Sequence, residues 1–241
     1  MKANNKFLAI IPARKGSKGI LNKNMQIIGE KPMIQFTIEA ALGANKLENI
    51  ILSSDDQNIL NLGKKIGLDI YFKRPKSLSL DNTRVSDVIL HSLDWYKATY
   101  KTLPENIILL QPTSPFRDSH DIDKAIELFN NSPKKTLVSA TEISQHPGDC
   151  LSKGIDGEFK RIEVNLNSTS LTGRQAYSET IFIDGGIYIS NTSEFLLTNE
   201  MIGNNPEVLM ILQSHGIDID TSFDLNVARA IYNSKEFKHQ L

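Results

Sequence analysis

Four cationic side chains lie within eleven residues near the start of the chain, in the run Ala13-Arg14-Lys15-Gly16-Ser17-Lys18-Gly19 and the following Lys23-Asn24. The two glycines let main-chain N–H groups approach oxygen atoms, and Arg and Lys neutralise negative charge. The combination favours a loop that binds a polyphosphate. Its spacing matches neither G-x-x-x-x-G-K-[ST] nor G-x-G-x-x-G, which excludes the two commonest phosphate-binding loops. The alternative is a solvated basic turn.

Two aspartates lie near the other end of the chain, in Ile217-Asp218-Ile219-Asp220-Thr221. In an extended segment, residues two apart point to the same side, with Cα atoms roughly 6.6 Å apart. A pair of carboxylates placed in this way suits a hard cation such as Mg²⁺. An isolated pair of this kind is more often part of a turn. The prediction of a magnesium site therefore depends on the basic loop lying beside it.

The composition excludes several other classes of protein. The formal net charge of −1 argues against a general nucleic-acid-binding protein. Cys150 is the only cysteine, so an intrachain disulfide and a cysteine zinc cluster are both excluded, and the five histidines lack metal-ligand spacing. The polar start Met1–Lys6 and the short apolar run after it resemble neither a signal peptide nor a membrane span. We expect a cytoplasmic protein without a membrane partner.

A repeated pattern of strands and helices must position these loops. Amphipathic helical stretches, such as residues 84–100, separate short apolar runs that are typical of buried strands. This alternation predicts an α/β fold with a mainly parallel sheet and helices on both faces. The predicted strands are Phe7–Pro12, Asn49–Ser53, Asp69–Phe72, Asn106–Gln111, Thr136–Ala140, Gly186–Ser190 and Val208–Gln213.

The pattern breaks between Glu142 and Asp184, where no helical period is present, and this stretch is interpreted as an insertion of loops and short hairpins. We expect one domain over residues 1–241 that includes this insertion. Near the end of the chain, Thr221 is predicted to cap a last helix, with Asp224 three residues later and Phe223, Val227 and Ile231 on its inner face.

In open α/β sheets, ligands bind beyond the carboxyl ends of the strands. Arg74 ends the third predicted strand, where it would reach a base or a phosphate, and Gln111-Pro112-Thr113-Ser114-Pro115 follows the fourth. Taken alone, each is more often an ordinary loop feature. His215 lies near the aspartate pair, and a role other than metal ligand is preferred for it.

Taken together, these motifs resemble the acylneuraminate cytidylyltransferases, or CMP-sialic acid synthetases, a family that includes CMP-legionaminic acid synthetases. The opening run Ile10–Gly19 with Lys23-Asn24 is similar to the start of these enzymes. Later blocks match in the same order over nearly the whole chain, and they are Arg74-Pro75 with Leu78-Ser79, Leu109–Pro115 with Arg117, Gly186–Ile189 and Ile217–Thr221.

The resemblance implies a Rossmann-like nucleotidyltransferase fold, a dimerisation segment at about residues 142–184 and a homodimer. It implies that CMP is transferred from CTP to the anomeric hydroxyl of an acidic nine-carbon sugar, a nonulosonate, with Mg²⁺ as cofactor. The implied nucleotide-binding residues are Arg14, Gly16, Ser17, Lys18, Lys23, Asn24, Arg74 and Ser86. The implied sugar-binding residues are Gln111, Arg174, Gln175, Asp184 and Tyr188. The implied catalytic residues are Arg14, Lys23, Asp218 and Asp220, and the two aspartates would hold the metal.

Two departures from the family pattern bear on the sugar. The chain has Asp184-Gly185-Gly186 where the family commonly has Asn-Gly-Ala, and Gly148-Asp149 where sialic acid enzymes often carry a basic residue. An acidic residue at position 149 or 184 would accept a hydrogen bond from a second amide of a diacetamido sugar. This slightly favours a legionaminate over N-acetylneuraminate.

Three questions stay open at this level. The general base is either Asp218 or a bound water. One alternative function is a cytidylyltransferase for an eight-carbon acid such as Kdo. Another is a non-catalytic relative that binds sugar nucleotides, although such proteins usually lose a cation or a carboxylate that this chain retains.

Overall fold

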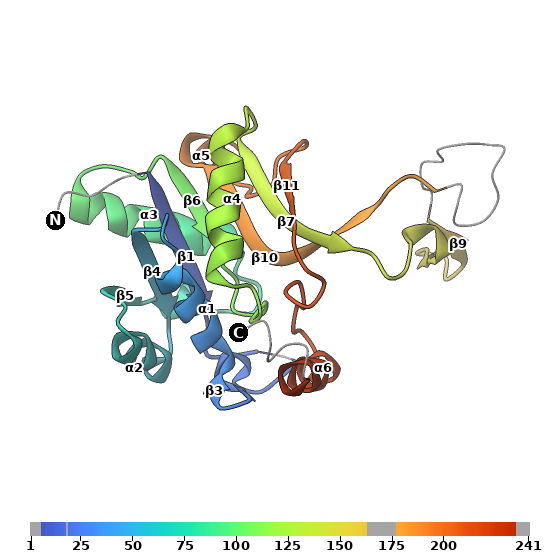
Figure 1. The fold of residues 1–241 in the computed structure, drawn as a ribbon, viewed down its shortest axis with the longest axis horizontal. Coiled ribbons are helices and arrows are strands. Elements are labelled where there is room, and N and C mark those ends of the chain that lie inside the picture. The colour runs from blue at the N-terminus through green and yellow to red at the C-terminus, as the bar shows by residue number, and fades with distance from the viewer. Residues whose placement is uncertain (1–5, 18, 163–176, 235–241) are drawn as a thin grey trace.

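A seven-stranded mixed sheet forms the centre of the molecule in the computed structural model, which describes residues 6–17, 19–162 and 177–234 (Figure 1). The strands lie in the order β11-β7-β10-β6-β1-β4-β5, and β10 is antiparallel to both of its neighbours while the other pairs are parallel. The strands of this sheet are β1 (Phe7–Ala13), β4 (Asn49–Ser54), β5 (Ile70–Lys73), β6 (Asn106–Leu109), β7 (Thr136–Glu142), β10 (Ile181–Asn191) and β11 (Glu207–Met210). The predicted α/β fold with a mainly parallel sheet is confirmed.

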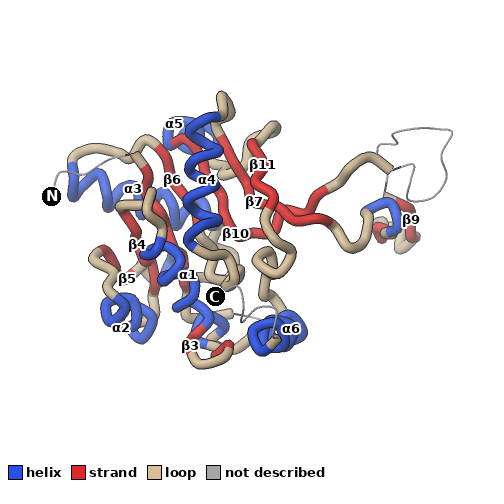
Figure 2. Tube along the Cα trace, viewed as in Figure 1, coloured by secondary structure: helices blue, strands red, loops and turns tan. Residues whose placement is uncertain are grey.

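Helices cover both faces of the sheet, as Figure 2 shows. The helices are α1 (Met33–Gly43), α2 (Gln57–Ile66), α3 (Val85–Tyr100), α4 (Ser119–Asn131), α5 (Thr192–Thr198) and α6 (Ser222–Asn233), with the 3₁₀ turns η1 (Lys23–Met25), η2 (Lys76–Leu78) and η3 (Pro147–Asp149). Two small two-stranded ladders complete the fold, β2 (Ile27–Ile28) with β3 (Lys31–Pro32) and β8 (Leu151–Lys153) with β9 (Phe159–Arg161). Within the described part of the chain, none of the helices is both long and apolar enough to cross a membrane.

Burial on both faces explains why the strands are continuous apolar runs. In β1, Ile11 packs with the core under α1, α2 and α4, whereas Ile10 packs with the core under α3 and α5. Successive side chains of a strand point to opposite faces, so a strand covered on both sides needs apolar residues at every position. The arrangement fixes the carboxyl ends of β1, β4, β5 and β6 along one edge.

The insertion is an arm that projects from the sheet (Figure 1). Strands β7 and β10 run out of the sheet side by side, and the described part of the arm also holds η3 and the β8–β9 hairpin. The pairing of β10 with β7 shifts between Ile183 and Tyr188, and Gly185 adopts a φ of 78° in this irregular stretch. A positive φ of this kind is readily adopted only by glycine. The expectation of loops and short hairpins is confirmed for the described residues.

The last helix is capped as expected, and its inner face is confirmed only in part. Thr221 and Asp224 form the reciprocal capping box of α6. Its buried residues are Leu225 and Ala228, and Ile231 packs against the same core as predicted, whereas Phe223 is 74% exposed. The prediction that Phe223 faces inward is wrong, because α6 packs against Ile28 and Phe36 beside the sheet rather than on it.

Candidate active site

A cleft of about 200 Å³ lies where β1, β5 and β6 end. Loops after adjacent parallel strands diverge where the strand order reverses, and here the chain passes from β1 to β4 and β5 on one side and to β6 on the other. The polar side of the cleft is formed by residues from the three connections that follow β1, β5 and β6, namely Arg14, Gly16, Ser17, Lys23, Asn24, Arg74, Gln111 and Thr113. The structure therefore brings together six of the eight predicted nucleotide-binding residues, Arg14, Gly16, Ser17, Lys23, Asn24 and Arg74.

The cations of the first loop are held by exposed ion pairs. Arg14 pairs with Asp81 at 2.5 Å, and the Lys23 ammonium donates to the Asp220 carboxylate at 2.9 Å. Asn24 donates its side-chain N–H to the main-chain oxygen of Arg14 at 2.9 Å, which ties η1 to the end of β1. Exposed ion pairs contribute on the order of 0–1 kcal/mol, so an incoming phosphate displaces such partners readily.

Arg74 is a buried cation in the cleft wall. Its residue surface is 4% exposed, and its Nε and Nη2 atoms are buried without a hydrogen-bond partner. Burial lowers the pKa of Arg74, whereas the neighbouring Asp55 carboxylate, 4.0 Å away, raises it. Buried N–H donors are normally satisfied. The unpaired donors of Arg74 therefore suit a ligand with hydrogen-bond acceptors.

The two predicted metal-binding carboxylates flank a residue that anchors them. Ile219 is fully buried, and its amide donates to the main-chain oxygen of Thr113 at 2.8 Å. The Lys23 ammonium also donates to the main-chain oxygen of Ile219 at 2.8 Å. A Cβ at Gly19 would lie 2.6 Å from the main-chain oxygen of Asp220, so the first loop approaches this segment closely. The basic loop and the aspartate pair lie side by side, which is the condition that the metal-site prediction required.

The Asp218 carboxylate is in an unfavourable environment for a negative charge. Burial raises the pKa of Asp218, and the nearby Asp220 raises it further, while a hydrogen bond from Thr113 and the charge of Lys23 act in the opposite direction. Its Oδ1 atom is buried without a hydrogen-bond partner. A bound cation would relieve both features.

A second cleft, of about 430 Å³, adjoins the first. Gln111 and Val85 line both clefts, and Ser86, Leu109 and Tyr188 line only the second. Burial raises the pKa of Tyr188 to about 12, helped by Asp184 and Asp218, so its phenol keeps its proton at neutral pH. The predicted sugar-facing residues Gln111 and Tyr188 are brought together here.

Two predicted residues lie elsewhere than expected. Ser86 lies in the wall of the second cleft, apart from the other predicted nucleotide-binding residues. Asp184 is fully buried, and its Oδ1 accepts hydrogen bonds from the Ser139 hydroxyl and the Gly186 amide, both at 2.6 Å. Asp184 lines neither cleft, and its Oδ2 is buried without a hydrogen-bond partner, so its role toward the sugar stays a prediction. Lys18, Arg174 and Gln175 lie outside the described residues.

Three supporting residues received no individual role from the sequence. Thr113 anchors both Ile219 and Asp218, and Asp55 accepts the Lys15 amide at 2.8 Å beside Arg74. Both follow predicted strands, so the rule that ligands bind at the carboxyl ends would have found them. Arg117 is fully buried and donates to the main-chain oxygen of Gly186 at 2.7 Å. Only the folded chain brings these two segments together.

The fold is an α/β sheet with a cleft at the carboxyl ends of its parallel strands. Among solved structures, the chain is similar to a CMP:2-keto-3-deoxy-manno-octonic acid synthetase complexed with CTP, with a TM-score of 0.67, 17% identity and coverage of 98% of this chain and 100% of that one. It is also similar to a 4-diphosphocytidyl-2C-methyl-D-erythritol synthase, with a TM-score of 0.68, 12% identity and coverage of 96% and 100%. At these identities the likeness concerns the fold.

Sequence comparison gives the family. The profile described as "Cytidylyltransferase" matches residues 8–153. The chain is 32% identical to an N-acylneuraminate cytidylyltransferase of Escherichia coli O18:K1:H7 over 95% of its own length, but it spans only about half, 53%, of that relative. It is 31% identical to a CMP-N,N'-diacetyllegionaminic acid synthase of Legionella pneumophila, covering 91% of this chain and 93% of that one. The chain belongs to the cytidylyltransferase family of enzymes, as the sequence motifs predicted.

Proposed function

We propose that this enzyme transfers CMP from CTP to the anomeric hydroxyl of a nonulosonic acid and releases pyrophosphate. The observation that carries the proposal is the convergence of Arg14, Lys23 and Arg74 with the Asp218–Asp220 segment at one edge of the sheet. Relatives named for N-acylneuraminate, N,N'-diacetyllegionaminic acid and pseudaminic acid support a nine-carbon acidic sugar.

The phosphate chain of CTP would lie along the first cleft. Arg14 and Lys23 supply positive charge there and exchange their carboxylate partners for phosphate oxygens. In the reaction, the sugar hydroxyl oxygen attacks the α-phosphorus and gives its proton to Asp218 or to a bound water. The bond to the pyrophosphate oxygen breaks at the same time, so negative charge grows on the leaving group. Cations held in place before the reaction stabilise that charge without reorganising.

The base would be selected by Arg74. Cytosine presents two adjacent acceptors, O2 and N3, and the unpaired Nε–H and Nη2–H of Arg74 are two donors. Uracil carries a hydrogen on N3, so this N3–H donor would face an N–H donor of Arg74. A site that hydrogen-bonds a substrate group discriminates strongly against an analogue that lacks it.

A divalent cation is part of the proposal. Asp218 and Asp220 fit Mg²⁺, because carboxylate oxygens are its preferred ligands and one buried Asp218 oxygen has no other partner. When bound, the ion would stabilise the charge that develops on the phosphoryl oxygens. Thr113 and Lys23 hold the segment in place through its backbone.

The sugar would occupy the second cleft, beside the first. Gln111 borders both clefts and would lie near the reacting ends of the two substrates. The Tyr188 phenol would donate or accept a hydrogen bond, and Leu109, Val85 and Met201 give the cleft apolar surface for acyl groups. The arrangement suits a sugar that carries both polar and acyl substituents.

The projecting arm supports a homodimer. It exposes large apolar side chains, with Ile155 fully exposed and Leu151, Phe159 and Phe182 between 56% and 64% exposed. Apolar side chains concentrated on a projecting segment are typical of an association surface. We propose that a second copy of this chain covers these side chains. We also propose that the enzyme works in the cytoplasm. Light scattering during size-exclusion chromatography measures the assembly, and a monomer at micromolar concentration would refute the dimer.

The test of function is an assay of pyrophosphate and CMP-sugar with CTP, Mg²⁺ and a panel of acidic sugars. The panel contains N-acetylneuraminate, N,N'-diacetyllegionaminate, pseudaminate and Kdo, and the Asp220→Asn variant serves as the control. We expect turnover with at least one nine-carbon acid. Turnover with Kdo alone would indicate the eight-carbon alternative. No turnover with any sugar would indicate a non-catalytic relative.

A further inference from the structure

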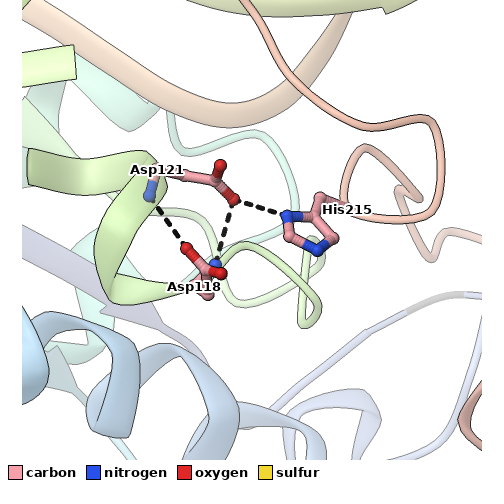
Figure 3. Close-up of side chains that lie close together, drawn as sticks. All are labelled: Asp118, Asp121 and His215. Carbon is pink, nitrogen blue, oxygen red and sulfur yellow. Dashed lines mark hydrogen bonds and ion pairs between the residues drawn. The ribbon is translucent and has the colours of Figure 1, made fainter. Parts of the chain in front are cut away.

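A buried ion pair lies outside both clefts. His215 Nδ1 and Asp121 Oδ2 are 2.7 Å apart, and the two residues are 7% and 6% exposed (Figure 3). Asp121 belongs to the first turn of α4, whereas His215 lies in the turn that follows β11. The pair therefore connects two elements that are 94 residues apart in the sequence.

The carboxylate of this pair is fixed by the helix cap. Asp121 Oδ2 also accepts the Asp118 amide at 3.2 Å, and Asp118 Oδ1 accepts the Asp121 amide at 2.8 Å, as Figure 3 shows. This is the capping box of α4. Because the cap holds the acceptor in one place, the imidazole that binds to it is also held in place.

His215 is three residues before Asp218. Between them, Gly216 packs so closely that a Cβ would lie 2.3 Å from Thr141 Cγ2 and 3.1 Å from Asp184 Cβ. On the far side of Asp218, the Ile219 amide is bonded to Thr113. The short segment is therefore anchored before Asp218 by His215 and between its two carboxylates by Ile219.

A competing interpretation makes this cluster a metal site. One potential ligand atom from each of Asp118, Asp121 and His215 lies within 4.8 Å of the others. However, Asp118 Oδ1 and Asp121 Oδ2 already accept main-chain N–H groups, and the His215 Nδ1 is used by Asp121. These contacts define a capped helix with an ion pair.

We propose that the His215–Asp121 pair is a positioning device for the Asp218–Asp220 segment, and that it sets the affinity with which that segment binds a divalent cation. The proposal rests on the function proposed above. Removing the imidazole would free the turn after β11, so the two carboxylates would be ordered only when the cation binds. Affinity falls when binding must supply the ordering.

The experiment uses the whole chain and three variants. His215→Ala removes the anchor, and His215→Asn keeps a donor near the position of Nδ1. His120→Ala is the matched control, because His120 is an exposed histidine on α4, the helix that carries Asp121. The probe is Mn²⁺, whose free form is measured by electron paramagnetic resonance. Hydrogen exchange of the Ile219 amide is followed without metal.

We expect His215→Ala to weaken Mn²⁺ binding by roughly 3- to 10-fold. This is less than the 10- to 100-fold loss that is typical when a residue hydrogen-bonded directly to a metal-ligating side chain is removed. The Ile219 amide should lose more protection than the amides of α3, which fall only with the global stability. His215→Asn should recover most of the affinity, and His120→Ala should match the wild type.

Three outcomes would overturn the proposal. A folded His215→Ala protein with wild-type Mn²⁺ affinity and a protected Ile219 amide would show that the pair does not position the segment. An equal loss of protection at Ile219 and throughout the sheet would show a purely structural role. Loss of one complete Mn²⁺ equivalent, with Ile219 still protected, would favour the cluster as a metal site. If the wild type fails to turn over CTP while the variants still differ in Mn²⁺ affinity, the proposed function fails and the positioning role stands.

Discussion

The Lys23 ammonium donates to the Asp220 carboxylate at 2.9 Å and so joins the two ends of the chain, 197 residues apart, beside the cleft. The same ammonium reaches the main-chain oxygen of Ile219 at 2.8 Å. Lys23 therefore has two kinds of partner, one that a phosphate can replace and one that fixes the backbone. The contact with the backbone of Ile219 does not depend on the neighbouring carboxylates. Substitutions of Asp218 or Asp220 should therefore change catalysis more than folding.

The first prediction concerns the two aspartates. Asp218→Asn and Asp220→Asn should each lower kcat by roughly 10²-fold, the loss expected when a group that stabilises developing charge is removed. Their effects on stability should differ. Burial raises the pKa of Asp218, so the stability that this carboxyl contributes in acid is lost as the pH rises through its folded pKa. At pH 7.5 without metal, Asp218→Asn should melt at or above the wild-type temperature.

Asp220 is the internal comparison, since its side chain is 72% exposed and its replacement should leave the melting temperature nearly unchanged. Steady-state assays at saturating Mg²⁺ and calorimetry without metal measure the two effects. Normal rates in both variants would make the carboxylates structural.

The second prediction separates two adjacent cations. Arg14→Ala should lower kcat/KM for CTP by about 10- to 100-fold, the equivalent of losing a charge-assisted hydrogen bond of 1.5–3 kcal/mol. Lys15→Ala is the control, because the Lys15 side chain is exposed and does not line the cleft. Both variants should melt near the wild-type temperature. Equal losses of activity in the two would indicate a general effect of loop charge.

Much of the fold follows from local pattern. The apolar runs predicted β1, β4, β5, β6 and β7 to within two residues at each end. Strands buried on both faces need apolar side chains at every position, which makes them visible in the sequence. The capping box of Thr221 and Asp224 is also predictable from the local sequence, because its two residues are only three positions apart. The position of the site followed from the rule for carboxyl ends of parallel strands.

The differences between the predictions and the structure occur where distant segments decide the outcome. Asp184 looked available to a ligand, but the shift in pairing between β10 and β7 buries it against Ser139. Phe223 fitted a helical stripe, yet α6 packs on the small β2–β3 ladder instead of the sheet. The sequence motifs included Arg117 but not its place in the fold, where it donates to the main-chain oxygen of Gly186 and burial lowers its pKa to about 10. None of these relationships has a local signature.

The third prediction concerns the pH dependence of the buried pair. The hydrogen bond from His215 to Asp121 raises the pKa of His215, with Asp118 acting in the same direction and burial and Lys124 opposing it. A histidine with a raised folded pKa contributes stability that is fully present below about pH 6.5 and is lost as the pH rises through the folded pKa.

His215→Ala should therefore lower the melting temperature most at pH 6, and the difference from the wild type should shrink at pH 9. Losing a charged hydrogen bond of 1.5–3 kcal/mol corresponds to about 3–12 °C in a chain of this size. His120→Ala should show no such trend across calorimetric scans. A difference that grows with pH would reverse the assigned sign and refute an imidazolium in the pair.

The last prediction concerns how the base is read. Arg74→Met has a similar length but no donors, so it should reduce kcat/KM for CTP by 10²-fold or more and narrow the preference for CTP over UTP. Removing one partner of a buried ion pair leaves the other charge uncompensated, so Arg74→Met should also lower the melting temperature through Asp55, and the rates are compared at a temperature at which the variant is folded. Arg74→Lys keeps the charge but loses the planar fork of donors, and it should not restore the preference. Rates with both nucleotides at a fixed sugar concentration measure the effect. If folded Arg74→Met still prefers CTP as the wild type does, Arg74 serves the packing of the cleft wall and the base is selected elsewhere.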